Sequence, residues 1–256
     1  LRHQKHDEIK KLLKSASGFS KIVLNAVEYA DVKAFIPPLL ETMTKGKKFL
    51  FRTAASFVKT FGFIDDKPLL ERKDFPDLQS KKPGILLIAG SYTGKTTMQL
   101  EALEKNHTVE KVELNVQKVL EGDFDAEVNE VAKKADRLLR EGKKPVVFTS
   151  RTLIKTANHL QTAETISSAL VSVVQTITQR PDIIVAKGGI TSSVIAVEGL
   201  KMKKAMVEGQ VLPGVPVIIA GKESKWPGIP YVIFPGNVGH KNSISELYQK
   251  ILGNVE

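Results

Sequence analysis

Residues 85–97 read ILLIAGSYTGKTT, and this stretch decides the kind of fold that the chain can adopt. Five consecutive apolar residues at 85–89 are typical of a strand covered on both faces, as in a parallel sheet flanked by helices. Gly90 and Ser91 then turn the backbone, and a helix is predicted over 96–106. A buried strand that leads through a glycine turn into a helix is the repeating unit of layered α/β domains.

The same alternation continues toward the C-terminus. Strands are predicted at 109–114, 145–148, 182–186, 205–207, 215–219 and 231–234, and helices at 126–140, 163–178, 193–200 and 243–252. The last three strands follow one another too closely for helical crossovers, so we expect antiparallel pairing there. The predicted fold class is therefore α/β: a layered domain with a mostly parallel sheet and some antiparallel C-terminal strands.

The residues before this domain are set apart by a polar, proline-bearing stretch at 65–83. In the first part we expect helices at 7–17, 31–44 and 54–61 and short strands at 22–26 and 49–52. Pro37-Pro38 should interrupt or restart the second helix. A length of 256 residues also favours more than one domain. We therefore divide the chain into residues 1–82, a partial α/β domain, and residues 83–256, the layered domain.

Composition excludes several classes of protein. Cysteine is absent, which rules out disulfides and thiolate chemistry, and the five histidines lack metal-ligand spacing. No apolar run reaches the roughly 18 residues that a membrane span needs. The N-terminus has neither a starting Met nor a hydrophobic signal region, so we expect a cytoplasmic protein and a chain that is a piece of a longer one.

The net charge of +10 is unevenly distributed. Residues 1–82 hold 17 Lys/Arg against 10 Asp/Glu, whereas residues 83–256 hold 21 against 18. A nucleic-acid footprint is one interpretation, and a lysine-rich solvated surface is the other. No aromatic-interleaved basic stripe, zinc-ligand cluster or helix-turn-helix signature supports the first, so we expect no nucleic-acid partner.

The loop after the strand at 85–89 resembles a G-x-x-x-x-G-K-[ST] phosphate loop only in part. Three residues, not four, separate Gly90 from Gly94, and position 89 is alanine. Hydroxyls at the start of the next helix could favour a bound anion. Equally, Ser91 or Thr93 could be an ordinary helix N-cap.

Glycine-rich loops follow three further predicted strands or strand pairs. KGGITSS at 187–193 lets a ligand approach the backbone and adds hydroxyl donors; the alternative is a tight turn with a Ser/Thr cap. GQVLPGVP at 209–216 and PGNVG at 235–239 could each be only a turn. Arg151, after the strand at 145–148, could face an anion or form a surface salt bridge. Several such loops at one sheet edge are what a nucleotide cradle would need.

KGGITSS, LPGVP and FPGNVG occur in this order, behind Gly90-Ser91 and FRTAASF at 51–57, and together they resemble the four-carbon acid sugar kinase family over nearly the whole chain. The resemblance implies two α/β domains. The N-terminal one would bind a sugar acid such as threonate, erythronate or 3-oxo-tetronate, and the C-terminal one would bind ATP. It implies ATP contacts at Ser91, Gly188, Gly189, Ile190, Thr191 and Gly236, with Gly209 and Gly214 shaping the same site.

The resemblance also implies ATP and Mg²⁺ as cofactors, ATP or ADP and a small sugar acid as partners, and it leaves a homodimer open. Many family members carry an acidic residue where this chain has Ile190, and others carry Ile. If that acid helps to hold Mg²⁺ in some members, this chain must hold the ion otherwise. The family's Asp-Asp-x-Thr-Gly-Ala and Asp-Ser-Thr-Leu-Arg-Gly motifs are absent.

Residues 1–82 are therefore expected to be the end of the sugar-acid domain, with the catalytic residues in a segment ahead of them. We expect this chain to be the ATP-binding portion of a kinase that phosphorylates the terminal hydroxyl of a small sugar acid. The alternative is a non-catalytic nucleotide- or metabolite-binding module on the same fold.

Overall fold

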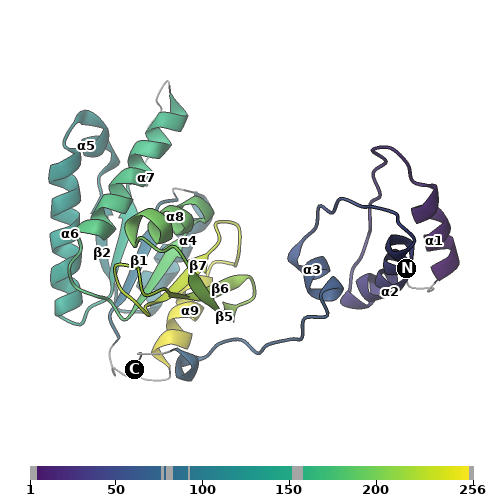
Figure 1. The fold of residues 1–256 in the computed structure, drawn as a ribbon. Helices are drawn as coiled ribbons and strands as arrows, with labels where there is room; N and C mark the ends of the chain where they lie inside the picture. Colours follow the sequence, from purple (N-terminus) through teal and green to yellow (C-terminus); the bar gives the residue numbers. More distant parts are fainter. Residues whose placement is uncertain (1–4, 76–77, 79–82, 92, 152–157, 254–256) are drawn as a thin grey trace. The chain divides into compact units, whose positions relative to one another are not determined.

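The computed structural model describes residues 5–75, 78, 83–91, 93–151 and 158–253. The chain forms two compact units, Leu1–Lys67 and Pro68–Glu256. Each unit is described by itself below, with its elements labelled as in Figure 1.

The described part of the second unit contains a seven-stranded sheet in the order β2-β3-β1-β4-β7-β6-β5. The strands are β1 Ile85–Ala89, β2 Glu110–Leu114, β3 Pro145–Thr149, β4 Ile183–Lys187, β5 Ala205–Leu212, β6 Val215–Ala220 and β7 Pro230–Phe234. The first five strands in this order pair in parallel, whereas β6 is antiparallel to both β7 and β5. These pairings confirm the predicted layered α/β fold with antiparallel C-terminal strands.

Helices cover both faces of this sheet. They are η1 Arg72–Asp74, α4 Gly94–Asn106, α5 Val116–Glu121, α6 Phe124–Arg140, α7 His159–Thr176, α8 Gly189–Val194, the π-helical η2 Ile195–Gly199 and α9 Ser243–Leu252. Leu86 and Ile88 of β1 pack with residues of α6, α7 and η2. Ile85 and Leu87 face the opposite way, toward α4 and α9. Figure 1 shows α5, α6 and α7 lying together. Because both faces are covered, every residue of β1 is buried.

One helix begins earlier than the sequence pattern predicts. The pattern places its start at residue 193, but α8 begins at Gly189, directly after β4. Gly188 has φ +119°, a conformation that side chains rarely allow, and this lets the backbone turn at once from strand to helix. The Ser192 hydroxyl lies 2.8 Å from the carbonyl oxygen of Ala186 and 2.6 Å from that of Gly188, which fixes the turn.

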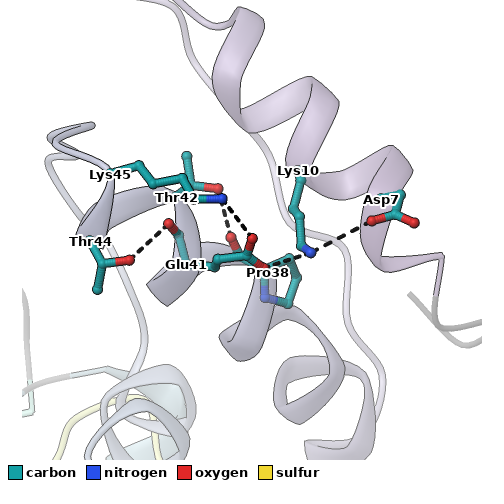
Figure 2. Close-up of polar contacts among 7 residues, drawn as sticks. All are labelled: Asp7, Lys10, Pro38, Glu41, Thr42, Thr44 and Lys45. Carbon is teal, nitrogen blue, oxygen red and sulfur yellow. Dashed lines mark hydrogen bonds and ion pairs between the residues drawn. The ribbon is translucent and has the colours of Figure 1, made fainter.

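The described residues of the first unit form three helices: α1 His6–Ser15, α2 Tyr29–Thr44 and α3 Ala55–Phe61. Their small core is built on Leu13, Phe35 and Leu39. Charged side chains link the first two helices, as Figure 2 shows. Glu41 of α2 accepts an ion pair from Lys10 of α1 at 2.6 Å and another from Lys45 at 2.9 Å. Lys10 also lies 3.6 Å from Asp7.

The strands predicted at 22–26 and 49–52 are wrong, since residues 5–67 contain no strand. A strand needs a neighbouring strand to satisfy its backbone donors and acceptors, and none lies within these residues. Leu24 and Phe49 instead pack against the helical core. The adjacent Val23 and Leu50 are 80% and 100% exposed, so the apolar runs bury only part of their side chains.

The predicted interruption of the second helix is also wrong, because α2 continues through Pro37 and Pro38. Each proline removes one backbone donor from the helix. Phe35 and Leu39 on either side are buried. The Thr42 hydroxyl donates to the carbonyl oxygen of Pro38 at 2.7 Å (Figure 2). Tertiary packing therefore outweighs the loss of helical hydrogen bonds.

Candidate functional site

Three loops leave the carboxyl edge of the sheet from adjacent strands. In the pairing register Ala89, the last residue of β1, lies opposite Lys187, the last residue of β4, which lies opposite Phe234, the last residue of β7. We name the following segments loop 1 (residues 90, 91 and 93, with 92 outside the described part of the chain), loop 2 (188–191) and loop 3 (235–239). They begin side by side, in the position where open α/β sheets bind ligands.

Loops 1 and 2 approach each other closely at Gly90 and Thr191. A Cβ placed on Gly90 would lie 2.7 Å from Oγ1 of Thr191 and 2.8 Å from a methyl carbon of Leu170. A Cβ on Gly188 would lie 3.1 Å from the same Thr191 oxygen. The Thr191 hydroxyl therefore lies between two glycines, which explains both glycines in terms of packing.

The rest of loop 2 is open to solvent. Gly189 is exposed, and a Cβ placed on it would meet nothing within 4 Å. The side chain of Ile190 is 79% exposed. Ser192, the next hydroxyl, is buried, and its carbonyl oxygen accepts a 2.7 Å hydrogen bond from Tyr231. Ser192 is thus part of the scaffold, whereas Gly189 and Ile190 can be approached from solvent.

Loop 3 is held by its carbonyl oxygens. Lys187 Nζ donates to the carbonyl oxygens of Pro235 at 2.8 Å and Gly236 at 3.3 Å. Lys95 Nζ donates to the next carbonyl, that of Asn237, at 3.0 Å. Gln99 Nε2 of α4 donates to the carbonyl oxygen of His240 at 3.0 Å and to that of Val238 at 3.5 Å. Side chains from β4 and α4 thus fix loop 3, with Gly236 in it, beside loop 2.

Loop 1 is held by Arg151, which follows β3. Its guanidinium donates to the carbonyl oxygens of Ser91 at 2.5 Å and Thr93 at 3.3 Å, and to the Thr97 hydroxyl at 2.7 Å. Burial lowers the pKa of Arg151. Of the two interpretations of Arg151, the surface salt bridge does not fit, because no ion pair of Arg151 occurs in the described part of the chain.

The hydroxyls of Ser91 and Thr93 bond to each other, and that of Thr93 also bonds to Thr96 of α4. Thr93 stands at the N-cap position of α4, but its side chain makes no capping bond to the helix backbone. Its hydroxyl lies 3.1 Å from that of Ser91 and 3.2 Å from that of Thr96. Ser91 is half-buried beside Arg151. Thr93 therefore occupies the predicted N-cap position, but its hydroxyl does not accept the backbone hydrogen bond by which an N-cap side chain stabilises a helix.

The hairpin between β5 and β6 reaches the site with one of its two predicted glycines. Gly214 has φ +76° in the turn, and a Cβ on it would lie 3.6 Å from the Val238 side chain in loop 3. Gly209 lies at a β-bulge, and a Cβ there would meet Leu70 at 3.3 Å. The structure thus brings Gly214 to the loops, whereas Gly209 packs on the chain segment that precedes β1.

Three cationic side chains lie at this edge of the sheet. Lys95, Arg151 and Lys187 form no ion pair with any described carboxylate. Within the same residues no group of three or more His, Cys, Asp or Glu could hold a metal ion. The donors offered here are backbone N–H groups, hydroxyls and cations, which suit an anionic ligand.

Lys187 was not among the residues expected from the sequence to contact the ligand. It is fully buried at the end of β4, where its ammonium group lies 4.4 Å from the centre of the Phe234 ring. Burial, with the nearby Lys95, lowers its pKa to about 8. The sequence did carry one signal that could have identified Lys187 as a site residue: it ends an apolar strand and directly precedes two glycines.

Among the described helices none is long and apolar enough to cross a membrane.

Comparison with known proteins identifies the second unit. The family model of the nucleotide-binding C-terminal domain matches residues 86–244, more than half of the chain. This match confirms the resemblance drawn from the loop motifs, and the matched residues contain all three loops. None of the curated proteins matches the chain at a significant level.

Several solved structures share the fold. A Salmonella typhimurium LT2 protein with the provisional name of tRNA synthase has a TM-score of 0.64 at 14% identity, over 94% of this chain and 55% of that one. A Haemophilus influenzae protein of the DUF1537 family has a TM-score of 0.54 at 16% identity, over 89% and 52%. A DUF1537 domain from Bordetella bronchiseptica, a domain-swapped dimer with bound citrate, has a TM-score of 0.55 at 14% identity, over 96% and 56%. The chain thus spans about half the length of each.

Proposed function

This chain belongs to the family of nucleotide-binding C-terminal domains, and we propose that loops 1, 2 and 3 hold the phosphates of ATP. The observation that carries the proposal is the convergence of these loops at paired strand ends, with cationic side chains around them that have no described acidic partner. Strand-end loops that open helices are where α/β proteins bind phosphates.

In this proposal the glycines and hydroxyls have separate tasks. Gly189 and its neighbour Ile190 offer backbone N–H groups on an exposed surface, where no Cβ of Gly189 obstructs a phosphate. Ser91 and Thr191 add hydroxyl donors from loops 1 and 2. Gly236, fixed through its carbonyl oxygen, offers its N–H group from loop 3. Together with Gly188, which turns the backbone into α8, these five positions are the ATP contacts that the family resemblance implies.

Magnesium fits this site as a companion of the nucleotide. The described residues have no carboxylate cluster, and Mg²⁺ commonly binds through substrate phosphates, water and few protein ligands. The hydroxyls of Ser91 and Thr93, 3.1 Å apart just before α4, are neutral oxygens that such an ion could use. When bound, Mg²⁺ would neutralise charge on the transferred phosphoryl group. The chain's own residues orient the phosphates and supply positive charge.

We extend the proposal to the protein that contains this chain. Its reaction would be transfer of the γ-phosphoryl group of ATP to the terminal hydroxyl of a small sugar acid. Residues 1–82 would then be the end of the sugar-acid-binding domain, and residues 83–256 the nucleotide-binding domain. The bound citrate in the Bordetella bronchiseptica relative, a small hydroxy acid, supports an acid-binding role for such longer proteins.

Calorimetric titration with Mg-ATP tests the nucleotide site. Wild-type chain should bind, Gly189→Ala should bind more weakly, and Gly189→Val should not bind. A Cβ at residue 189 meets nothing within 4 Å, so the free energy of unfolding of both variants should lie within about 1 kcal/mol of the wild-type value. Equal affinity of all three proteins would refute the assignment of loop 2.

Kinase activity is tested on the full gene product that contains this chain. ATP-dependent phosphorylation of four-carbon sugar acids should appear there, and Gly189→Val should remove it. Nucleotide binding without phosphorylation of any sugar acid would instead favour the non-catalytic binding module.

A further inference from the structure

Lys187 lies at the centre of the site but cannot be a direct ligand of the nucleotide. An ammonium group has three N–H donors. Here two carbonyl oxygens of loop 3 and the face of Phe234 surround it, and the side chain is fully buried. Lys95, which is exposed at the start of α4, is the lysine that a phosphate could reach.

The contacts of Lys187 determine the direction of two peptide groups. No cis peptide occurs in the described chain, and the C=O and N–H of a trans peptide point in opposite directions. Because the carbonyl oxygens of Pro235 and Gly236 point at Lys187, the N–H groups of Gly236 and Asn237 point away from it. Two consecutive N–H groups with a common direction form an anion-binding nest.

Burying an ammonium group without a carboxylate is expensive, and here no described acid offsets that cost. Burial first, and the nearby Lys95 second, lower the pKa of Lys187 to about 8. The group therefore remains mostly protonated at pH 7. A nearby anion would offset the cost of its burial.

We infer that Lys187 is a positioning residue of the phosphate site, which holds loop 3 so that the N–H groups of Gly236 and Asn237 face the bound anion. This inference rests on the proposed nucleotide function of the same loops. The lysine acts through the loop and through its charge, and the ligand it serves is the phosphate chain of a nucleoside triphosphate or diphosphate.

The second unit contains a matched control. Lys225 Nζ donates to the carbonyl oxygens of Val174 at 2.7 Å and Gln175 at 2.6 Å and also to that of Ile177, and it lies 4.7 Å from the Trp226 ring centre. Burial lowers its pKa too. Lys225 thus resembles Lys187 in its carbonyl and aromatic contacts, although it is only partly buried and Asp136 acts on its charge. It binds the end of α7 rather than a loop of the site.

The experiment compares Lys187→Met and Lys225→Met by calorimetric titration with Mg-ATP, with thermal unfolding followed by circular dichroism. Both variants should lose similar stability, because each leaves backbone carbonyls without donors. Lys187→Met should weaken binding at pH 7 by about tenfold, the effect of 1.4 kcal/mol. Lys225→Met should bind as the wild type does.

A pH series on the wild type provides a second readout that needs no variant. Its affinity should fall between pH 7 and pH 9 with a midpoint near 8, as Lys187 loses its proton. The same series on Lys187→Met should lack that step. Wild-type affinity without the step, or equal affinities of wild type and Lys187→Met, would overturn the inference and leave the proposed function standing. No wild-type binding at all would refute the proposed function, and the inference with it.

Discussion

Substituting Gly90 by alanine tests the close approach of loops 1 and 2. The new Cβ would lie 2.7 Å from Oγ1 of Thr191 and 2.8 Å from a methyl carbon of Leu170, and both distances are too short for any real Cβ contact. Leu170 is 2% exposed on α7 and cannot easily move away. Overpacking of this kind costs about 1–3 kcal/mol. For a unit of this size that corresponds to a decrease in Tm of about 2–12 °C.

The assay follows unfolding of the second unit alone. Trp226 is the chain's only tryptophan and is buried in this unit, so its fluorescence during urea unfolding reports on the sheet and not on residues 1–67. Gly94→Ala is the matched control. A Cβ at Gly94, the first residue of α4, meets nothing within 4 Å, so this variant should be unchanged or more stable by up to about 1 kcal/mol.

A double mutant identifies the cause of the loss. Thr191→Ala removes the oxygen that the new Cβ would meet, so Gly90→Ala should cost less in that background. The interaction energy between the two substitutions should reach about 0.5–3 kcal/mol. Two results would refute the packing argument for this glycine. One is that the two substitutions change the free energy of unfolding additively, and the other is that Gly90→Ala changes it by less than about 0.5 kcal/mol.

Two further predictions concern charged side chains. Arg151→Lys keeps the charge but loses the planar fork that holds the carbonyl of Ser91, so Mg-ATP affinity measured by calorimetry should fall by about 3–10-fold; unchanged affinity would exclude a role for loop 1. In the first unit, hydrogen bonds from Lys10 and then Lys45 lower the pKa of Glu41 to about 2. The stabilisation from this group is therefore present above its ordinary pKa near 4.5 and is lost as the pH falls toward 2. The protection of the α1 and α2 amides against hydrogen exchange, relative to their intrinsic rates at each pH, should fall over that range in the wild type but not in Glu41→Gln. High salt should reduce the difference.

The layered sheet could be predicted because its strands carry a direct signal. An uninterrupted apolar run such as 85–89 forms a strand that is buried on both faces, so the apolar composition of the run identifies the strand. The short spacing of the last three strands likewise excluded helical crossovers and gave their antiparallel pairing. The start of α8 could not be predicted, since it depends on the backbone conformation of Gly188 rather than on any periodicity.

Residues 22–26 and 49–52 show where local pattern was insufficient. Their apolar runs match a strand, but a strand exists only with a partner, and a pattern within one segment cannot supply one. At the site, glycines and hydroxyls were identifiable because their loops follow strand ends. Lys187 was missed as a site residue because its role depends on Pro235 and Gly236, which are about 48 positions away in the sequence.

The strand order has a consequence for how the protein is made. β1 lies between β3 and β4, and β4 ends at Lys187, 98 residues after β1 ends at Ala89. A ribosome adds about 5–20 residues each second, so roughly 5–20 s pass between the synthesis of the apolar segment ILLIA and that of β4, its second neighbour in the sheet. During that interval at least one edge of the segment lacks its neighbouring strand and is open to association with other chains. Dependence on chaperones should therefore be greatest while residues 90–187 are being synthesised.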